Sequence, residues 1–200
     1  MCDLMVEVGP DHPTLNEGWT VADLAAHVYV REHKPSTGPG LVLGGAFARH
    51  TDRIRLQALD RLGFDEVVAR VRSGPPTLLK PVNGVMNVNE YFIHHEDVRR
   101  GDGATGPRAE TEVADLDEAL WAMQGRGTRL LVRGLDDVDL TLARPSGETK
   151  HVGGGTRAAT LTGRPTEISL FLSGRRDPAE VTIEGDEGAS RELREGSLGL

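Results

Sequence analysis

The hydrophobic pattern of this chain changes its period near residue 136, and this change limits the folds that the chain can form. Before this point, apolar residues recur at the spacing of helices, whereas after it they alternate with polar residues, as in strands. The alternating apolar positions are Val138, Leu140, Leu142, Val181 and Ile183. The sequence therefore predicts an α+β chain, with a helical domain over residues 1–136 and a small α+β domain over residues 137–200.

Local signals place helices and strands within these two parts. Thr20 and Asp23 form a capping box, which predicts a helix from Val21 to Glu32 that ends before Pro35. The Gly- and Pro-rich residues 34–48 predict a long loop. Further helices are expected at 49–62, 65–72, 88–100, 113–133 (softened near Gly125 and Gly127) and 165–173. A hairpin turn at 145–147 and a strand at 157–162 complete a second domain of about four strands and one helix.

Charge and composition exclude several classes of function. The chain has 23 Lys and Arg residues against 31 Asp and Glu residues, a net charge of −8, which argues against nucleic acid as the main partner. It has no apolar run long enough for a membrane helix and no signal-peptide pattern, so we expect a cytoplasmic protein with no membrane partner. Cys2 is the only cysteine, so no intrachain disulfide can form.

The helix expected at 88–100 carries a polar stripe where core residues should be. At about 100° per residue, Glu90, His94 and Asp97 share one face, and apolar residues flank them on both sides. The opposite side of this helix carries Glu96, Arg99 and Arg100, together with Phe92, which breaks the pattern and is expected to meet another element. Because apolar residues flank the stripe, we expect it to face the interior of a helical bundle.

A buried carboxylate and a buried imidazole need partners, and a metal ion is an effective one. Glu90 and His94 are four residues apart, so both side chains can reach one point beside the helix. His27 lies on the apolar face of the earlier helix. If the two faces meet, three ligands converge and leave a vacant position, as in catalytic zinc sites. Asp97 could then orient a ligand as a second-shell acceptor, or bind the metal directly.

Each of these residues also has a simpler interpretation. Glu90 could be the last residue of a capping box that begins at Asn87. His27 could be an ordinary half-buried histidine bonded to a backbone carbonyl. His94 could pair with Asp97 alone. These alternatives remain open at the level of the sequence.

Three segments resemble known families. EGWTVADLAAHV (17–28) is similar to the metal-ligand helix of the DinB-like superfamily, and more closely to mycothiol-dependent maleylpyruvate isomerases of actinobacteria. NEYFIHHEDVRR (89–100) resembles the partner motif of the same family, and the closest resemblance is to an actinobacterial subfamily that shares both motifs. GRPTEISLFLSGRRDPAEVTIEGD (163–186) resembles the small sterol-carrier-like domain that follows the bundle.

The resemblance implies a DinB-like helical bundle followed by a sterol-carrier-like domain. It gives His27, Glu90 and His94 the three ligand positions of a divalent metal, most simply zinc. Arg175, or its neighbour Arg176, would complete the active site. Only about eight residues, Met1 to Val8, could form the first helix, so we expect this helix to be short or truncated. A bundle lacking part of a helix would expose apolar surface and could form a homodimer.

The implied function is a metal-dependent enzyme that uses a low-molecular-weight thiol such as mycothiol. Its partners would be this thiol and an electrophilic substrate, in an isomerase or a thiol S-transferase reaction. Arg175 would hold a carboxylate of the substrate. A non-catalytic metal-binding protein of the same fold is the alternative, and a carrier of apolar ligands ranks last.

Overall fold

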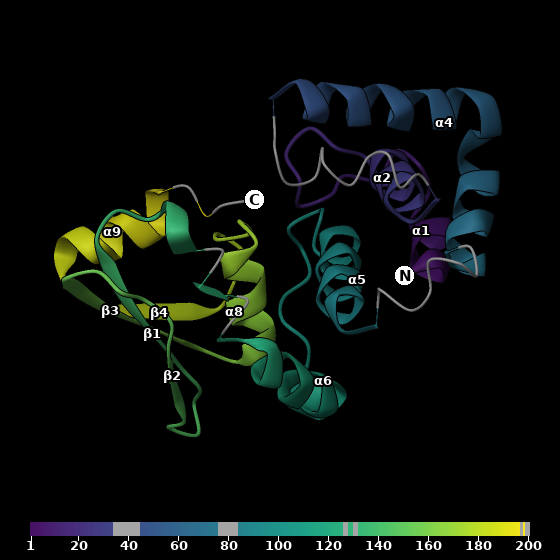
Figure 1. Cartoon of the computed structure of the whole chain (residues 1–200). Helices are drawn as coiled ribbons and strands as arrows, with labels where there is room; N and C mark the ends of the chain where they lie inside the picture. The colour runs from purple at the N-terminus through teal and green to yellow at the C-terminus, as the bar shows by residue number, and fades with distance from the viewer. Residues whose placement is uncertain (34–44, 76–83, 126–127, 130–131, 197, 199–200) are drawn as a thin grey trace. The chain divides into compact units, whose positions relative to one another are not determined.

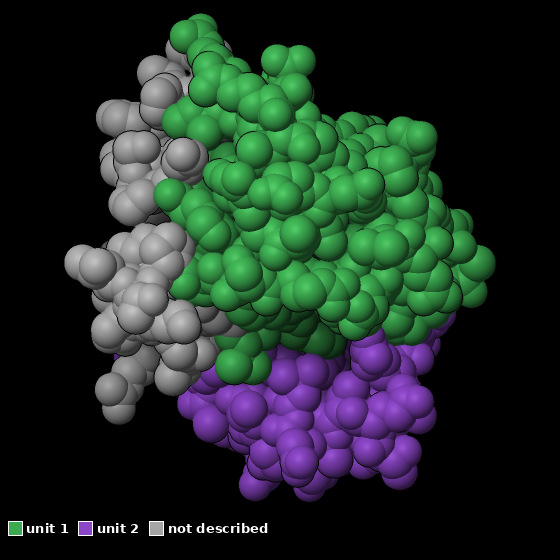
Figure 2. Space-filling model, turned by 90° about the vertical axis from the view of Figure 1, so that its right-hand side faces the viewer, with its two compact units in different colours: residues 1–105, 200 green, residues 106–199 purple. Residues whose placement is uncertain are grey.

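The computed structural model describes residues 1–33, 45–75, 84–125, 128–129, 132–196 and 198 of the chain. Among these residues it contains seven α-helices and one four-stranded mixed sheet, so the predicted α+β class is confirmed (Figure 1). The chain divides into two compact units, residues 1–105 and 106–199 (Figure 2). Within the described part of the chain, no helix has the length and apolar character needed to cross a membrane.

The first unit is helical, and the second contains the sheet. The helices of the first unit are α1 (Cys2–Val8), α2 (Val21–His33), α4 (Gly45–Ser73) and α5 (Gly84–Arg99). The elements of the second unit are α6 (Glu110–Met123), a 3-10 turn (Val132–Gly134), β1 (Val138–Ala143), β2 (Thr149–His151), β3 (Arg157–Gly163), α8 (Pro165–Leu172), β4 (Val181–Gly185) and α9 (Glu187–Glu195).

Helix α2 begins where the capping box predicts. The Thr20 backbone N–H donates to the Asp23 carboxylate over 3.0 Å, and the Asp23 N–H donates to the Thr20 hydroxyl over 3.3 Å. These two bonds satisfy backbone donors that the first turn of a helix leaves unpaired. The helix ends at His33, one residue later than predicted.

Helix α4 consists of two helical segments that meet at Gly63. Gly63 adopts φ 75° and ψ 166°, a conformation outside the helical region that only glycine reaches readily. The break separates the two helices predicted at 49–62 and 65–72. The predicted loop was too long, because its residues 45–48 belong to α4, and its residues 34–44 lie outside the described residues.

Helix α5 begins at Gly84, four residues before the predicted start. Asn87 therefore lies inside the helix and cannot be its N-cap, so the capping-box interpretation of Glu90 is wrong. The helix predicted at 113–133 with a break or softening near Gly125 is interrupted there: α6 starts earlier, at Glu110, and ends at Met123, residues 128–129 are helical again, and a 3-10 turn follows at Val132–Gly134. Residues 126–127, which include part of the expected soft region, lie outside the described residues.

The core of the first unit forms between α1, α2 and α4, with α5 contributing Val98. Its fully or almost fully buried members are Met5, Val21, Leu24, Ala25, Ala26, Val28, Tyr29, Val30, Val67, Val68, Val71 and Val98. Burial of such side chains stabilises the fold by roughly 1.5–3 kcal/mol for each large one. The buried stripe of α2 that contains Leu24 and Val28 also fixes the direction of His27, which lies next to it on the same face.

The second unit is built on a sheet with the strand order β2-β1-β3-β4. Strands β1 and β3 are parallel, with Leu140 opposite Ala159, whereas both edge strands pair antiparallel. Helices α8 and α9 pack against this sheet around Leu140, Leu161 and Ile168. The sequence predicted the four strands and α8, but it gave no account of α9, which Asp186 caps through the Ala189 N–H over 2.9 Å.

The two compact units divide between residues 105 and 106, whereas the sequence placed the domain boundary near residue 136. The difference arises because α6 packs on α8. The Asp117 carboxylate accepts from the Thr166 N–H over 2.9 Å, and the Gln124 amide donates to the Pro165 carbonyl over 2.7 Å and to the Ser169 hydroxyl over 2.9 Å. Helix α6 therefore belongs with the sheet, although its sequence pattern is helical.

Replacing Asp117 with alanine should destabilise the second unit by about 1–2 kcal/mol. Asp117 is 5% exposed and caps the first turn of α8 from a different helix, so its loss leaves a buried N–H unpaired. Urea unfolding can be followed by Trp121 alone in a Trp19→Phe background, since the chain has only two tryptophans. Exposed Asp115 on the same helix provides the control, and an equal loss for Asp115→Ala would contradict the capping role.

Candidate metal site

The structure brings His27, Glu90 and His94 together where α2 and α5 meet in the first unit. The ring centroids of His27 and His94 are 5.3 Å apart, with the rings nearly perpendicular. The Glu90 Oε2 atom is 3.7 Å from Nε2 of His94. His27 and Glu90 are partly exposed and His94 is buried, so the cluster lies at the edge of the packed interior.

The two ring nitrogens of His94 have different surroundings. Nδ1 is 3.0 Å from the carboxylate of Asp97, which is fully buried. Nε2 is buried and has no hydrogen-bond partner within the described residues. When Nδ1 carries the proton and donates it to Asp97, Nε2 presents a lone pair toward Glu90 and His27, the tautomer that a metal ligand needs. An unpartnered buried nitrogen otherwise costs free energy, so this atom is the strongest indication of a ligand.

The spacings of the three side chains are close to those of a zinc site. At Zn–N and Zn–O distances of about 2.0–2.2 Å, two tetrahedral ligand atoms lie about 3.3 Å apart. The Nε2–Oε2 distance of 3.7 Å is slightly longer. Two imidazoles on one such ion have centroids about 5 Å apart, close to the 5.3 Å between His27 and His94.

The three side chains are nevertheless not in the positions that metal coordination requires. Across the described segments, no group of three or more His, Cys, Asp or Glu side chains is arranged so that it could hold a metal ion as it stands. Arg31 also pairs with one of these side chains, since its Nε lies 3.6 Å from the Oε2 atom of Glu90. The same carboxylate oxygen therefore faces a guanidinium on one side and His94 on the other.

A tryptophan covers the other side of His27. The rings of Trp19 and His27 meet edge to face with centroids 5.4 Å apart. The Arg55 guanidinium lies 4.6 Å from the centroid of Trp19 and pairs with Asp23, the capping residue of α2. The capping box, the tryptophan and His27 thus form one connected structure, which restricts how the His27 ring can turn.

Sequence reasoning did not assign a role to Arg31 or Arg55. The signal for Arg31 was present, because it stands four residues after His27 and so shares its helix face. No comparable signal existed for Arg55, which reaches Trp19 and Asp23 from the distant helix α4.

Arg175 lies in the second unit, in the turn that follows α8. Its backbone N–H donates to the Leu170 carbonyl over 3.0 Å, and its Nη1 donates to the Ser173 carbonyl over 2.6 Å. The neighbouring Arg176 donates to the Gly196 carbonyl and lies 6.0 Å from the Phe171 ring centroid. Burial lowers the pKa of Arg176 from its ordinary value. Both arginines are thus tied to the end of α8 within their own unit.

The side of α5 that was expected to face away from the interior is buried as well. Glu96 is fully buried and Arg100 is 2% exposed. Phe92, the exception on this side, is 7% exposed, as expected for a residue that meets another element. The Glu96 carboxylate accepts from Nε of Arg100 over 2.7 Å and from Nε of Arg99 over 2.9 Å. The helical wheel failed here because Glu96 and Arg100 are buried on the side opposite the stripe, and a wheel built on one apolar face does not anticipate a second buried side.

A second carboxylate is buried beside the site. Glu32 of α2 is 3% exposed, and the Tyr91 hydroxyl of α5 donates to its Oε1 atom. Burial raises the pKa of Glu32 above its usual value, and the bond from Tyr91 only partly offsets this. Burial, together with the bond to Glu32, likewise raises the pKa of Tyr91.

The stability of the first unit should therefore fall as the pH rises above about 4.5, the ordinary pKa of Glu32. Because the pKa of Glu32 is higher in the folded state, the folded state binds this proton more tightly than the unfolded chain does. This tighter binding favours folding at low pH, and its contribution to the free energy of unfolding is lost as the pH rises from the unfolded pKa through the raised folded pKa. Urea unfolding of the wild type and of Glu32→Gln from pH 4 to pH 8 measures the effect. The difference in unfolding free energy between Glu32→Gln and wild type should grow with pH. A difference that stays constant with pH, or the same trend in the exposed Glu7→Gln variant, would contradict the role of Glu32.

Replacing Asp97 with asparagine should weaken zinc binding by about 10- to 100-fold. The substitution keeps the shape of the side chain but removes the charge that fixes the His94 tautomer. Competition with a chromophoric chelator measures the affinity. Exposed Asp102→Asn, just beyond the same helix, is the control, and equal affinities of Asp97→Asn and wild type would remove Asp97 from the site.

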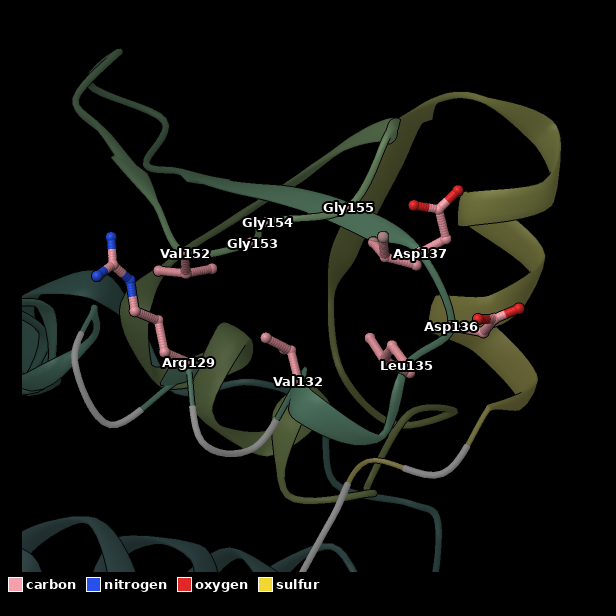
Figure 3. Close-up of a pocket in the computed structure, with 10 residues that line it drawn as sticks. Arg129, Val132, Leu135, Asp136, Asp137, Val152, Gly153, Gly154 and Gly155 are labelled. Carbon is pink, nitrogen blue, oxygen red and sulfur yellow. The ribbon is translucent and has the colours of Figure 1, made fainter.

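The second unit contains a wide, open pocket of about 730 Å³ beside the loop Gly153–Gly155 (Figure 3). Val132, Leu135 and Val152 point into it, whereas the carboxylates of Asp136 and Asp137 point away. The apolar lining belongs to the core, and Val132, Leu135 and Val152 are at most 9% exposed. A cavity for an apolar ligand needs accessible apolar walls, so these residues do not favour a lipid carrier.

Comparisons of this chain with protein-family models, with curated proteins and with solved structures gave no match. The resemblance to DinB-like and sterol-carrier-like proteins therefore stays a prediction, and the site must be judged on its own geometry.

Proposed function

We propose that this chain binds one divalent metal ion, zinc in the simplest case, through His27, Glu90 and His94. The observation that carries the proposal is the buried Nε2 of His94, which has no hydrogen-bond partner among the described residues. Asp97 contacts the other nitrogen of this ring, Nδ1, and the ring lies near Glu90 and His27. A packed histidine without a ligand would be expected to bond through both nitrogens or to expose one to water. The neighbouring Glu90 carboxylate supplies the negative charge that a metal site needs.

We further propose that the site serves chemistry on a low-molecular-weight thiol such as mycothiol. A zinc ion with one open position lowers the pKa of a bound thiol and so supplies its nucleophilic thiolate form. In this chain, Asp97 would keep the proton on Nδ1 of His94, and Trp19 would shield His27 from water. Following the resemblance, Arg175 would hold a carboxylate of the electrophilic substrate, in an isomerase or S-transferase reaction.

The test of this function is thiol consumption with a panel of electrophiles, measured on zinc-loaded and metal-depleted protein. We expect consumption only with the zinc-loaded form, and loss of that activity in His94→Ala. Equal rates in the loaded and depleted forms would end the enzymatic proposal. Zinc binding without any thiol chemistry would support the alternative, a non-catalytic metal-binding protein, and Arg175→Ala would then leave ligand binding unchanged.

A further inference from the structure

The open pocket of the second unit has one wall made of extended main chain (Figure 3). This wall is the loop 153–155, which follows β2 and runs alongside the start of β1. The Gly153 N–H donates to the Leu140 carbonyl over 3.1 Å. The Gly155 N–H donates to the Val138 carbonyl over 3.3 Å. The loop therefore extends the edge of the sheet beyond the end of β2.

Gly154 is the residue of this loop that β1 does not hold. Successive residues of an extended chain present their N–H and C=O groups to opposite sides, so those of Gly154 point away from β1. Within the part of the chain that the structure describes, Gly154 makes no hydrogen bond. Its main chain thus offers a donor and an acceptor, as an open sheet edge does to another chain.

The fold explains two of the three glycines in this loop. A Cβ at Gly153 or at Gly155 would collide with the β1 backbone, so the packing of the loop requires glycine there. A Cβ at Gly154 would meet nothing within 4 Å, and the φ of Gly154 lies outside the left-handed region. The fold itself therefore does not require glycine at this position. A glycine within an extended segment is typical of a place where a ligand or another backbone approaches closely.

One end of the pocket is basic. Arg129 lies there beside Val152, and its exposed side chain has no ion pair with the described residues (Figure 3). Lys150, two residues before Val152, adds a second positive charge, although its ammonium group donates to two carbonyls at the end of α6. The carboxylate of Asp139 on β1 pairs with His151. The Arg129 guanidinium is thus available to bind an anion.

The other end of the pocket is acidic. Asp136 and Asp137 lie there, with their carboxylates turned outward (Figure 3). Glu192 adds a third carboxylate, whose Oε1 is 3.4 Å from the backbone nitrogen of Asp136. Arg157 offsets one of these charges, since its Nε is 3.7 Å from Oδ2 of Asp137. Three carboxylates and one guanidinium leave two net negative charges at this rim.

We propose that this pocket binds an extended peptide that ends in a free carboxylate. The carboxylate pairs with Arg129, whose planar guanidinium matches its two oxygens. Because Arg129 lies at the start of the loop, the peptide runs antiparallel to residues 153–155 and exchanges hydrogen bonds with Gly154. A Lys or Arg side chain upstream of the peptide C-terminus lies over Asp136 and Asp137. The site lies wholly within the second unit and involves no metal ion.

The walls of the pocket favour a peptide over other ligands. The unpaired groups belong to a sheet edge, which pairs with a main chain. The apolar lining residues Val132, Leu135 and Val152 are at most 9% exposed, so they offer little surface to an apolar ligand. The acidic rim repels a phosphate dianion, whereas it attracts a peptide with a basic side chain.

The experiment is an NMR titration of the ¹⁵N-labelled full chain with the peptide acetyl-Lys-Ala-Ala-Ala. One form of the peptide has a free carboxylate and the other a C-terminal amide. We expect the amide form to bind about tenfold more weakly, because it cannot form a charge-assisted pair with Arg129. Saturation with the free-carboxylate peptide should slow hydrogen exchange of the Gly154 N–H by about tenfold, because this group gains a partner.

Variants of the chain and of the peptide separate the contributions of the two ends. Arg129→Gln should lose about tenfold in affinity for the free-carboxylate peptide and bind both forms equally. Arg129→Lys, which keeps the charge but not the planar fork, should be intermediate. The exposed Arg191→Gln on α9 is the matched control and should equal wild type. A peptide with glutamate in place of lysine should bind more weakly, because it meets the acidic rim.

Several results would overturn this inference. Equal affinities of the wild type for the two peptide forms would remove the carboxylate from the recognition, and this arm needs no variant. Equal affinities of wild type and Arg129→Gln for the free-carboxylate peptide would remove Arg129. Acetate binding as tightly as the peptide, or unchanged hydrogen exchange at Gly154, would reject pairing with a main chain. Tighter binding of the glutamate peptide would reject the role of the acidic rim.

Discussion

Replacing His94 with alanine should lower the zinc affinity of this chain by about 100-fold or more, which corresponds to about 2.8 kcal/mol. The substitution removes the imidazole that lies between Glu90 and His27, together with the nitrogen that Asp97 orients. The affinity can be measured by competition with a chromophoric chelator, or from the visible spectrum of the cobalt-substituted protein.

The neighbouring histidine provides a matched control for this experiment. His95 is half-buried and points about 100° away from His94 around the helix. His95→Gln should therefore keep the zinc affinity of the wild type. Metal removal gives a second readout, because an ion that binds only the folded chain stabilises it by about 2.7 kcal/mol at 100 times its Kd. A chelator should lower the Tm of wild type but not of His94→Ala, and equal zinc affinity in His94→Ala and wild type would reject the site.

Replacing Glu96 with alanine should destabilise the first unit by about 3–5 kcal/mol. Glu96 is fully buried and accepts hydrogen bonds from Arg99 and Arg100, and Arg100 is itself 2% exposed. Removing the carboxylate takes a charged partner away from a buried guanidinium, which costs far more than the loss of a surface ion pair. Urea unfolding, followed by Trp19 in a Trp121→Phe background, measures the change.

Helix α4 offers a pair with the same spacing in a different environment. Glu66 and Arg70 are also four residues apart, and their ion pair is 2.8 Å long but largely exposed. Glu66→Ala should have only a small effect on the free energy of unfolding, because water screens exposed pairs. If Glu66→Ala and Glu96→Ala destabilised the protein equally, burial would not be the cause of the Glu96 effect.

Local sequence signals predicted much of the fold, because each acts over a few residues. The Thr20–Asp23 capping box gave the start of α2, and Gly63 separates two helices where the pattern expected two. The boundary between the units was harder to predict, because it depends on Asp117 and Gln124 reaching α8 from a distant helix. Such tertiary contacts override the periodicity on which the boundary near residue 136 was based.

The candidate site shows the same division between local and distant information. The spacing of Glu90, His94 and Asp97 on one helix was readable, and the structure places Asp97 on Nδ1 of His94. The burial of Glu96 and Arg100 was not readable, because a wheel assumes that one face of a helix is exposed. The spacing placed Arg31 on the same helix face as His27, but its pairing with Glu90 joins two helices and could not be read from either segment alone.

The meeting of α2 and α5 also has a consequence for the order of folding. These helices are separated in the sequence by the whole of α4, so His27 and His94 come together only after a long loop has closed. Closing such a loop costs chain entropy before any contact rewards it, and this slows the step. If zinc binds as proposed, the appearance of the cobalt spectrum during refolding would time the docking of α5, separately from the earlier formation of the individual helices.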